Sequence, residues 1–254
     1  MTTATISQSK LLSTSSTKIQ HSNGYGTEFY TAIMYLQPHT QSGTNLCAFA
    51  SDGCAMACLV SAGRMPMQSA FNARANRTNL FLNDRPAFKA QLEAEIAEHV
   101  RISERKGLKP AIRLNGTSDI AWELVFPDLF TKFSNVTFYD YTKYPINKRT
   151  RIPANYDLTF SRSEANHDEV IKSLEGGRRV AVVFSTKKGQ DLPTQYLGRP
   201  VVDGDLHDMR FLDDKAVIVG LRAKGNGKND NSGFVVEITS EIMVDSLIYG
   251  AIKQ

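Results

Sequence analysis

The sequence contains no run of about 20 apolar residues, the length that a membrane-spanning helix needs. Its first twenty residues, MTTATISQSKLLSTSSTKIQ, also lack the continuous apolar core of a secretion signal. These two absences argue against an integral membrane protein and against an exported one. We therefore expect a cytoplasmic protein that does not bind membranes.

Neither sign of charge dominates the chain. Lys and Arg number 30 and Asp and Glu number 26, which leaves a net charge of +4 and no long run of one sign. Electrostatic affinity for nucleic acid grows with the number of phosphates that a protein contacts. Small basic groups, such as residues 148–151, are typical of solvated loops. We expect nucleic-acid binding to be weak and sensitive to salt.

Cysteine is scarce, and the only three cysteines lie close together in LCAFASDGCAMACLV as Cys47, Cys54 and Cys58. An odd number without a secretion signal argues against a disulfide framework. Thiolates are soft ligands that favour zinc, copper(I) or iron–sulfur clusters. Structural zinc normally takes four ligands, for which His39 is the nearest further candidate. A [4Fe–4S] cluster held by three thiolates, with one iron open, suits this set better. Three thiols buried as small apolar groups are the remaining alternative.

The rest of the chain alternates short apolar runs with amphipathic segments. Strands are predicted over residues 29–36, 111–114, 136–139, 156–160, 179–184 and 216–221. Helices are predicted over residues 67–82, 86–106, 120–133 with a break at Pro127, and 168–174. Strands separated by helices imply parallel pairing and right-handed crossovers. We expect a mobile Ser/Thr-rich tail over residues 1–26 and a single α/β domain over residues 27–254, forming a partial or complete β/α barrel.

Polar clusters follow the predicted strands where each strand ends. In parallel β/α proteins, ligands bind at the carboxyl ends of the strands. The first strand leads to the cysteine loop, and a barrel would gather the other clusters beside it on one rim. The candidate binding residues at this rim are Asn115, Gly116, Thr117, Ser118 and Asp119 after the second strand, and Ser161, Arg162 and Ser163 after the fourth.

Two further polar segments have less specific patterns. Residues 203–208 (DGDLHD) are acidic but lack the spacing of a calcium loop, which favours a hydrogen-bonded turn. Residues 224–233 (KGNGKNDNSG) are rich in glycine but lack the GK[ST] ending of a phosphate loop, which favours a mobile loop.

A three-cysteine loop directly after the first strand of a β/α barrel resembles the radical S-adenosylmethionine superfamily. In that superfamily, three cysteines hold a four-iron cluster whose open iron chelates the amino acid part of S-adenosylmethionine. The resemblance implies that the two rim clusters contact this cofactor. The chain departs from the usual Cys-x3-Cys-x2-Cys motif, since its spacing is Cys-x6-Cys-x3-Cys. It also has Ala57 where the superfamily usually has an aromatic residue that packs on adenine.

A second resemblance extends over most of the chain. Its motifs are the cysteine loop, RLNGTSDI at 113–120, FYDYTK at 138–143, LTFSRSEAN at 158–166, and VVDGDLHDMRFLDD followed by VGLRAKG. They are similar to a phage family named after a mycobacteriophage protein, gene product 88. The resemblance implies a viral protein in the host cytoplasm with a barrel like that of the radical enzymes. It implies no particular reaction.

Three functions are consistent with these patterns. The first is an enzyme whose [4Fe–4S] cluster binds and cleaves S-adenosylmethionine. The second is a non-catalytic iron–sulfur protein, structural or redox-sensing, that binds a host or viral partner. The third is a zinc-stabilised protein associated with nucleic acid. Metal content separates the third from the others, and cofactor binding separates the first from the second.

Overall fold

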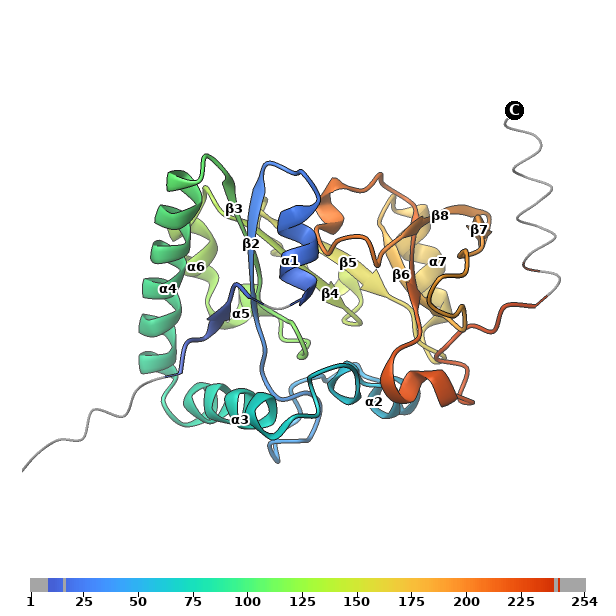
Figure 1. Ribbon diagram of the computed structural model, residues 1–254, viewed down its shortest axis with the longest axis horizontal. Helices are drawn as coiled ribbons and strands as arrows, with labels where there is room; N and C mark the ends of the chain where they lie inside the picture. Colours follow the sequence, from blue (N-terminus) through green and yellow to red (C-terminus); the bar gives the residue numbers. More distant parts are fainter. Residues whose placement is uncertain (1–8, 16, 240–241, 243–254) are drawn as a thin grey trace, which may run out of the picture.

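The computed structural model describes residues 9–15, 17–239 and 242, and one sheet of nine strands runs through this part of the chain (Figure 1). The strand order is β1-β2-β3-β4-β5-β6-β9-β8-β7. Every neighbouring pair is parallel except the outermost two, β1–β2 and β8–β7. The strands are β1 (Leu12–Ser13), β2 (Phe29–Met34), β3 (Lys109–Arg113), β4 (Thr137–Thr142), β5 (Tyr156–Ser161), β6 (Val180–Phe184), β7 (Gln195–Tyr196), β8 (Arg199–Asp203) and β9 (Ile218–Arg222).

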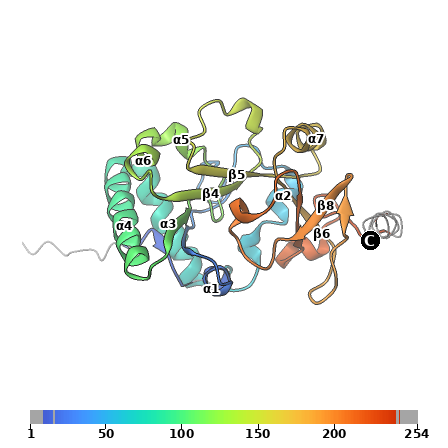
Figure 2. The same cartoon turned by 90° about the horizontal axis from the view of Figure 1, so that it is seen from above.

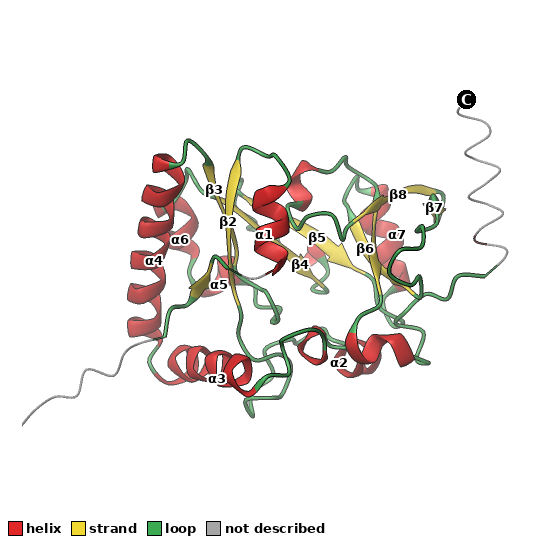
Figure 3. Cartoon of the chain, viewed as in Figure 1, coloured by secondary structure: helices red, strands yellow, loops and turns green. Residues whose placement is uncertain are grey.

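Seven α-helices and four 3-10 turns accompany the sheet in the described residues (Figure 3). The helices are α1 (Thr17–Gly24), α2 (Asp52–Met56), α3 (Gln68–Asn83), α4 (Arg85–Arg105), α5 (Trp122–Val125), α6 (Pro127–Lys132) and α7 (His167–Glu175). The turns are η1 (Leu59–Ser61), η2 (Ile146–Lys148), η3 (Arg210–Leu212) and η4 (Gly225–Asn229). Helices α5, α6 and α7 lie on the side of the sheet opposite to α1 (Figure 2). None of the helices described is long and apolar enough to cross a membrane.

The predicted α/β class is confirmed, but the sheet remains open. Its end strands are β1 and β7, and these do not pair with each other in the described chain, so a complete barrel does not form. The six predicted strands correspond to β2, β3, β4, β5, β6 and β9, in chain order across the sheet. The sequence patterns missed β8, because its residues RPVVD include a proline and are only partly buried.

Helix α4 shows how the sequence pattern leads to the packing. Asp84 caps its start, since the side chain accepts a hydrogen bond of 3.0 Å from the backbone N–H of Ala87. Phe88, Leu92 and Ile96 recur every four residues and are fully buried on one face. This face fixes α4 against the sheet beside β3.

The N-terminal segment differs from the expected tail. Residues 1–8 and 16 lie outside the described residues, but the following segment forms β1 and α1. Leu11, Leu12 and Ile19 are buried there. The backbone N–H groups of Leu11 and Leu12 donate to the carboxylate of Glu95 on α4, at 2.9 and 2.8 Å. These few apolar side chains hold the segment on the domain despite its Ser/Thr-rich composition.

Candidate functional site

The three cysteines line one cavity of about 200 Å³ at the carboxyl ends of the parallel strands. Cys47 lies in the loop after β2, Cys54 lies on α2, and Cys58 immediately precedes η1. The cavity also touches residues that follow or end β3, β4, β5, β6 and β9. The predicted meeting of the cysteine loop with other strand ends therefore occurs, although the sheet is open.

Glu164, in the turn after β5, holds residues 46–61, here called the cysteine segment, in place. Glu164 Oε2 accepts a hydrogen bond of 2.8 Å from Ser51 Oγ, and its Oε1 accepts one of 2.8 Å from the N–H of Gly53. Ser51 in turn caps α2 by accepting from the N–H of Cys54 at 3.3 Å. A Cβ at Gly53 would lie only 2.8 Å from Glu164 Oε1 and 2.2 Å from Ser232 Oγ. Glycine is therefore required where this loop approaches its neighbours.

Burial raises the pKa of two of the thiols. It raises the pKa of Cys47 to about 12, and the nearby carboxylate of Asp119 adds to this effect. Burial also raises the pKa of Cys58, with a further contribution from Cys54. Lys143 lies beside these sulfurs; burial by itself lowers its pKa, but Cys54 and Asp119 outweigh this and raise it. A bound metal would replace the thiol protons, since a coordinating thiol is deprotonated outright.

Among the described residues, no group of three or more His, Cys, Asp or Glu side chains converges so as to hold a single metal ion. The cysteines instead surround a shared space. Zinc needs its ligands to meet at one point, whereas the thiolates of a four-iron cluster bind different irons. His39 contributes its backbone N–H, 3.3 Å from Cys47 Sγ, while its ring lies 3.2 Å from the hydroxyl of Thr40.

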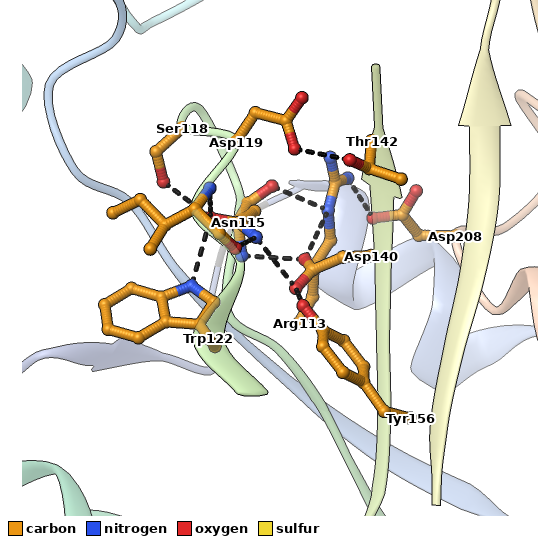
Figure 4. Close-up of polar contacts among 10 residues, drawn as sticks. Arg113, Asn115, Ser118, Asp119, Trp122, Asp140, Thr142, Tyr156 and Asp208 are labelled. Carbon is orange, nitrogen blue, oxygen red and sulfur yellow. Dashed lines mark hydrogen bonds and ion pairs between the residues drawn. The ribbon is translucent and has the colours of Figure 1, made fainter. Parts of the chain in front are cut away.

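The predicted loop after β3 is organised by the side chain of Asn115 (Figure 4). Its Oδ1 accepts hydrogen bonds from Ser118 Oγ at 2.9 Å, from the N–H of Ile120 at 3.0 Å and from Trp122 Nε1 at 3.0 Å. Its Nδ2 donates to the carbonyl of Ile120 at 2.9 Å and to Asp140 Oδ2 at 3.2 Å. Both polar atoms of the Asn115 side chain therefore form hydrogen bonds within the protein, and these bonds fix the shape of the loop that lines the cavity.

The same loop is joined to the cysteine segment. Thr117 Oγ1 donates a short hydrogen bond to the carbonyl of Leu36, and the N–H of Asp119 donates to the carbonyl of Leu46 at 2.9 Å. The Asp119 carboxylate accepts from Thr142 Oγ1 and from the N–H of Lys143, both at 2.7 Å. The five predicted residues lining the cavity here are Asn115, Gly116, Thr117, Ser118 and Asp119.

Of the three predicted residues after β5, Ser161 and Arg162 line the cavity. Ser163 is not among the lining residues, and it is 2% exposed. Its N–H donates to Asn166 Oδ1 at 2.7 Å, which forms the turn into α7. Ser163 therefore lies behind the two residues that reach the cavity.

The glycine-rich segment, defined here as the strap (residues 224–235), is ordered against the cysteine segment. The N–H of Asn226 donates to Ser61 Oγ at 3.0 Å, and Gly225 has a φ of +53° with no room for a Cβ beside Ser61. Lys224, Gly227 and Phe234 of the strap line the cavity. The expectation of a mobile loop is therefore not met, because Gly225 and Gly227 allow close packing on Ser61 and Ala57, next to the cysteines. Their number in the sequence was the available signal for this contact.

The acidic segment after β8 forms the predicted hydrogen-bonded turn. The N–H of Asp205 donates to Asp203 Oδ1 at 2.9 Å. Arg222 Nη1 lies 2.8 Å from Asp203 Oδ2 and 3.2 Å from Asp205 Oδ2. These carboxylates hold basic side chains at the cavity.

No curated protein matches the chain, and no solved structure matches it. One family model does match, described as Gene product 88, over residues 5–238. This span includes the cysteine segment, the loop after β3, the end of β5 and the strap. The similarity inferred from the sequence motifs is confirmed by this match, and the chain belongs to the gene product 88 family.

Proposed function

We propose that this protein binds a [4Fe–4S] cluster through Cys47, Cys54 and Cys58, with one iron left open to a ligand in the cavity. The observation that carries the proposal is the lining of a single cavity by all three cysteines of the chain. They come from a loop, a short helix and the residue before a 3-10 turn, and hydrogen bonds from other parts of the chain fix that segment.

The residues around the cavity fit such a group in their chemistry. Three thiols supply soft donors, and Gly53 lets the short helix that carries Cys54 pack closely on Glu164. The ammonium group of Lys143 offsets part of the negative charge that thiolate ligands bring. When bound, a cluster of this kind supplies an electron and an iron that accepts an outside ligand. The chain's own residues position the thiols and limit the access of water.

The enzyme hypothesis adds S-adenosylmethionine as the ligand of the open iron. It is supported by the position of the cavity at the ends of a run of parallel strands, with the cysteines after β2. Phe234 on the strap offers an aromatic surface in the cavity, although Ala57 does not. A cavity of about 150 Å³ holds a benzene-sized ligand. The cavity here, at about 200 Å³, can therefore bury at least part of such a cofactor.

The non-catalytic iron–sulfur hypothesis is the second candidate, and it is favoured by Ala57, which offers no aromatic surface for adenine. A cluster covered by the strap would stabilise the cysteine segment without admitting a large cofactor. Metal ligation is coupled to folding, so such a role would appear as lost stability when iron is removed.

Anaerobic purification followed by iron, sulfide and zinc analysis tests the cluster. We expect about four iron and four sulfide per chain, and a loss of iron when any one of the three cysteines is changed to alanine. Gln41→Ala, an exposed change before the cysteines, is the control and should keep its iron. Stoichiometric zinc without sulfide would refute the proposal and restore the zinc hypothesis.

Electron paramagnetic resonance of the reduced protein then separates the two iron–sulfur functions. A spectrum that changes with S-adenosylmethionine, together with release of 5′-deoxyadenosine, supports the enzyme. An unchanged spectrum and no product, with a full complement of iron, supports the non-catalytic protein.

A further inference from the structure

The cavity is lined by five basic side chains and one acidic one, Asp119. The basic residues come from the ends of four strands, β3, β4, β5 and β9, or the segments just after them: Arg113, Lys143, Arg162, Arg222 and Lys224. An excess of cations around a small cavity indicates an anionic ligand only where the protein leaves a cation uncompensated.

Two of the cations are matched by the acidic turn after β8. Arg222 bonds to both Asp203 and Asp205, and it also donates to the carbonyl of Gln190 at 2.9 Å. Lys224 Nζ lies 2.6 Å from Asp205 Oδ1. Their charges and most of their donors are used within the protein.

Two more lie at the other side of the cavity. Arg113 Nη1 donates to Asp208 Oδ2 at 2.6 Å, and its Nε donates to the carbonyl of Asn115 at 3.1 Å. The backbone N–H of Lys143 donates to Asp119 Oδ2 at 2.7 Å, and its Nζ lies 5.4 Å from the centre of the Phe234 ring. Arg113 is thus paired with a carboxylate, and Lys143 lies on the side of the cavity that holds Asp119 and the cysteines.

Arg162 is different. Its Nη1 donates to the backbone carbonyls of Gly233 at 2.5 Å and Phe234 at 2.8 Å, and no carboxylate lies within ion-pair distance in the described chain. A guanidinium group has five N–H donors in a rigid fork. The two carbonyls accept from the N–H groups of Nη1. The N–H groups of Nη2 and Nε are therefore available to a ligand, and the strap holds the guanidinium at the cavity wall.

The neighbouring wall is apolar. Ala181 and Val183 of β6, Leu221 of β9 and Phe234 of the strap line the same cavity as Arg162. Small-molecule sites commonly combine apolar walls with a few fixed polar groups that orient the ligand. The size of the cavity, about 200 Å³, limits the buried part of that ligand to a small group.

We propose that the cavity binds a small organic anion, whose carboxylate or phosphate group pairs with Arg162 and whose apolar part lies against β6 and β9. This inference rests on the proposed use of the cavity as a ligand site beside the cysteines. The planar fork of Arg162 matches the geometry of an oxyanion, with which it can form two parallel charge-assisted hydrogen bonds. Arg162 is then a specificity-determining residue.

Isothermal titration of the anaerobically purified protein with hexanoate and with the neutral hexanamide tests the proposal. The wild type should bind hexanoate about tenfold more tightly than hexanamide, or better, because hydrogen bonds between two charged groups typically change a dissociation constant by about tenfold or more. Arg162→Gln should lose that preference, and Arg162→Lys should keep part of it. Arg101→Gln on α4, where the side chain is 70% exposed, is the matched control and should behave as the wild type.

The preference between the two probes distinguishes recognition from a merely structural role of Arg162. If Arg162→Gln only loosened the strap, both probes would weaken together and the preference for hexanoate would persist, which would overturn the proposal. Equal binding of both probes by the wild type would overturn it as well. Iron analysis of the same samples reports separately on the cluster, so failure of one proposal is not mistaken for failure of the other.

Competition identifies the source of the anionic group. If S-adenosylmethionine displaces hexanoate from the wild type, the site serves the carboxylate of the cofactor. If both bind together, it serves a separate substrate. Both results support an anion site at Arg162.

Discussion

Replacing Asn115 by alanine should destabilise the protein strongly, because one side chain supports the whole loop after β3. The change removes five hydrogen bonds: three accepted by Oδ1 and two donated by Nδ2. It leaves the indole N–H of Trp122 and a carboxylate oxygen of Asp140 without this partner, both in buried side chains. At about 1 kcal/mol for each bond, with extra loss for groups left unsatisfied, the free energy of unfolding should fall by about 3 to 5 kcal/mol.

Urea unfolding followed by tryptophan fluorescence measures this loss directly, because Trp122 is the only tryptophan in the chain. Asn79→Ala is the matched control. Asn79 is exposed on α3 and bonds to the side chain of Asn83 at 2.6 Å, so its loss should change stability by about 0.5 kcal/mol or less.

Asn115→Ala should also lower the metal content of the protein. The loop after β3 bonds to the cysteine segment through Asp119 and Thr117, so Asn115→Ala should retain less iron than Asn79→Ala. A variant at position 115 that unfolds within about 1 kcal/mol of the wild type would show that the loop is held in another way. The claim that Asn115 organises it would then be wrong.

Two further outcomes follow from other contacts. Glu164→Gln should weaken the two hydrogen bonds that hold the cysteine segment, so the variant should retain several-fold less iron after dilution into a chelator. Glu175→Gln, at the exposed end of α7, is the control and should retain iron as the wild type does. Equal iron retention by the two variants would contradict this role of Glu164. Burial and the charge of Arg210 lower the pKa of His207 to about 4. Since an unfolded histidine titrates near pH 6.5, the unfolded state takes up a proton first, and stability should fall as the pH drops from about 6.5 to about 4. Thermal unfolding of His207→Asn should show a smaller fall over that range, and an equal fall would refute the assignment.

The sequence patterns located the regular elements well where burial follows a simple period. The helix predicted over residues 86–106 is α4, and the predicted interruption at Pro127 separates α5 from α6. These elements carry their signals locally, in the spacing of apolar residues and in capping residues such as Asp84. The sequence patterns did not predict strand β8, because a partly buried strand lacks a continuous apolar run.

The candidate site was predictable only in part, for a related reason. The cysteines and the loop at residues 115–119 follow strands, so the general rule for parallel sheets placed them together. Glu164 and the strap act through contacts with residues more than 100 positions away in the sequence. No local pattern records such a contact. The closed or open state of the sheet likewise depends on how its end strands meet, which strand spacing does not specify.

The strap has a consequence for the order in which the protein is made. The cysteines lie at positions 47 to 58, while the strap that packs on them begins at residue 224. During synthesis the N-terminal parts of a chain emerge and begin to fold first. The three thiols therefore leave the ribosome well before the strap residues that bond to Ser61 and Arg162. If the proposed cluster binds, iron and sulfide delivered to the growing chain would reach the thiols before these contacts form.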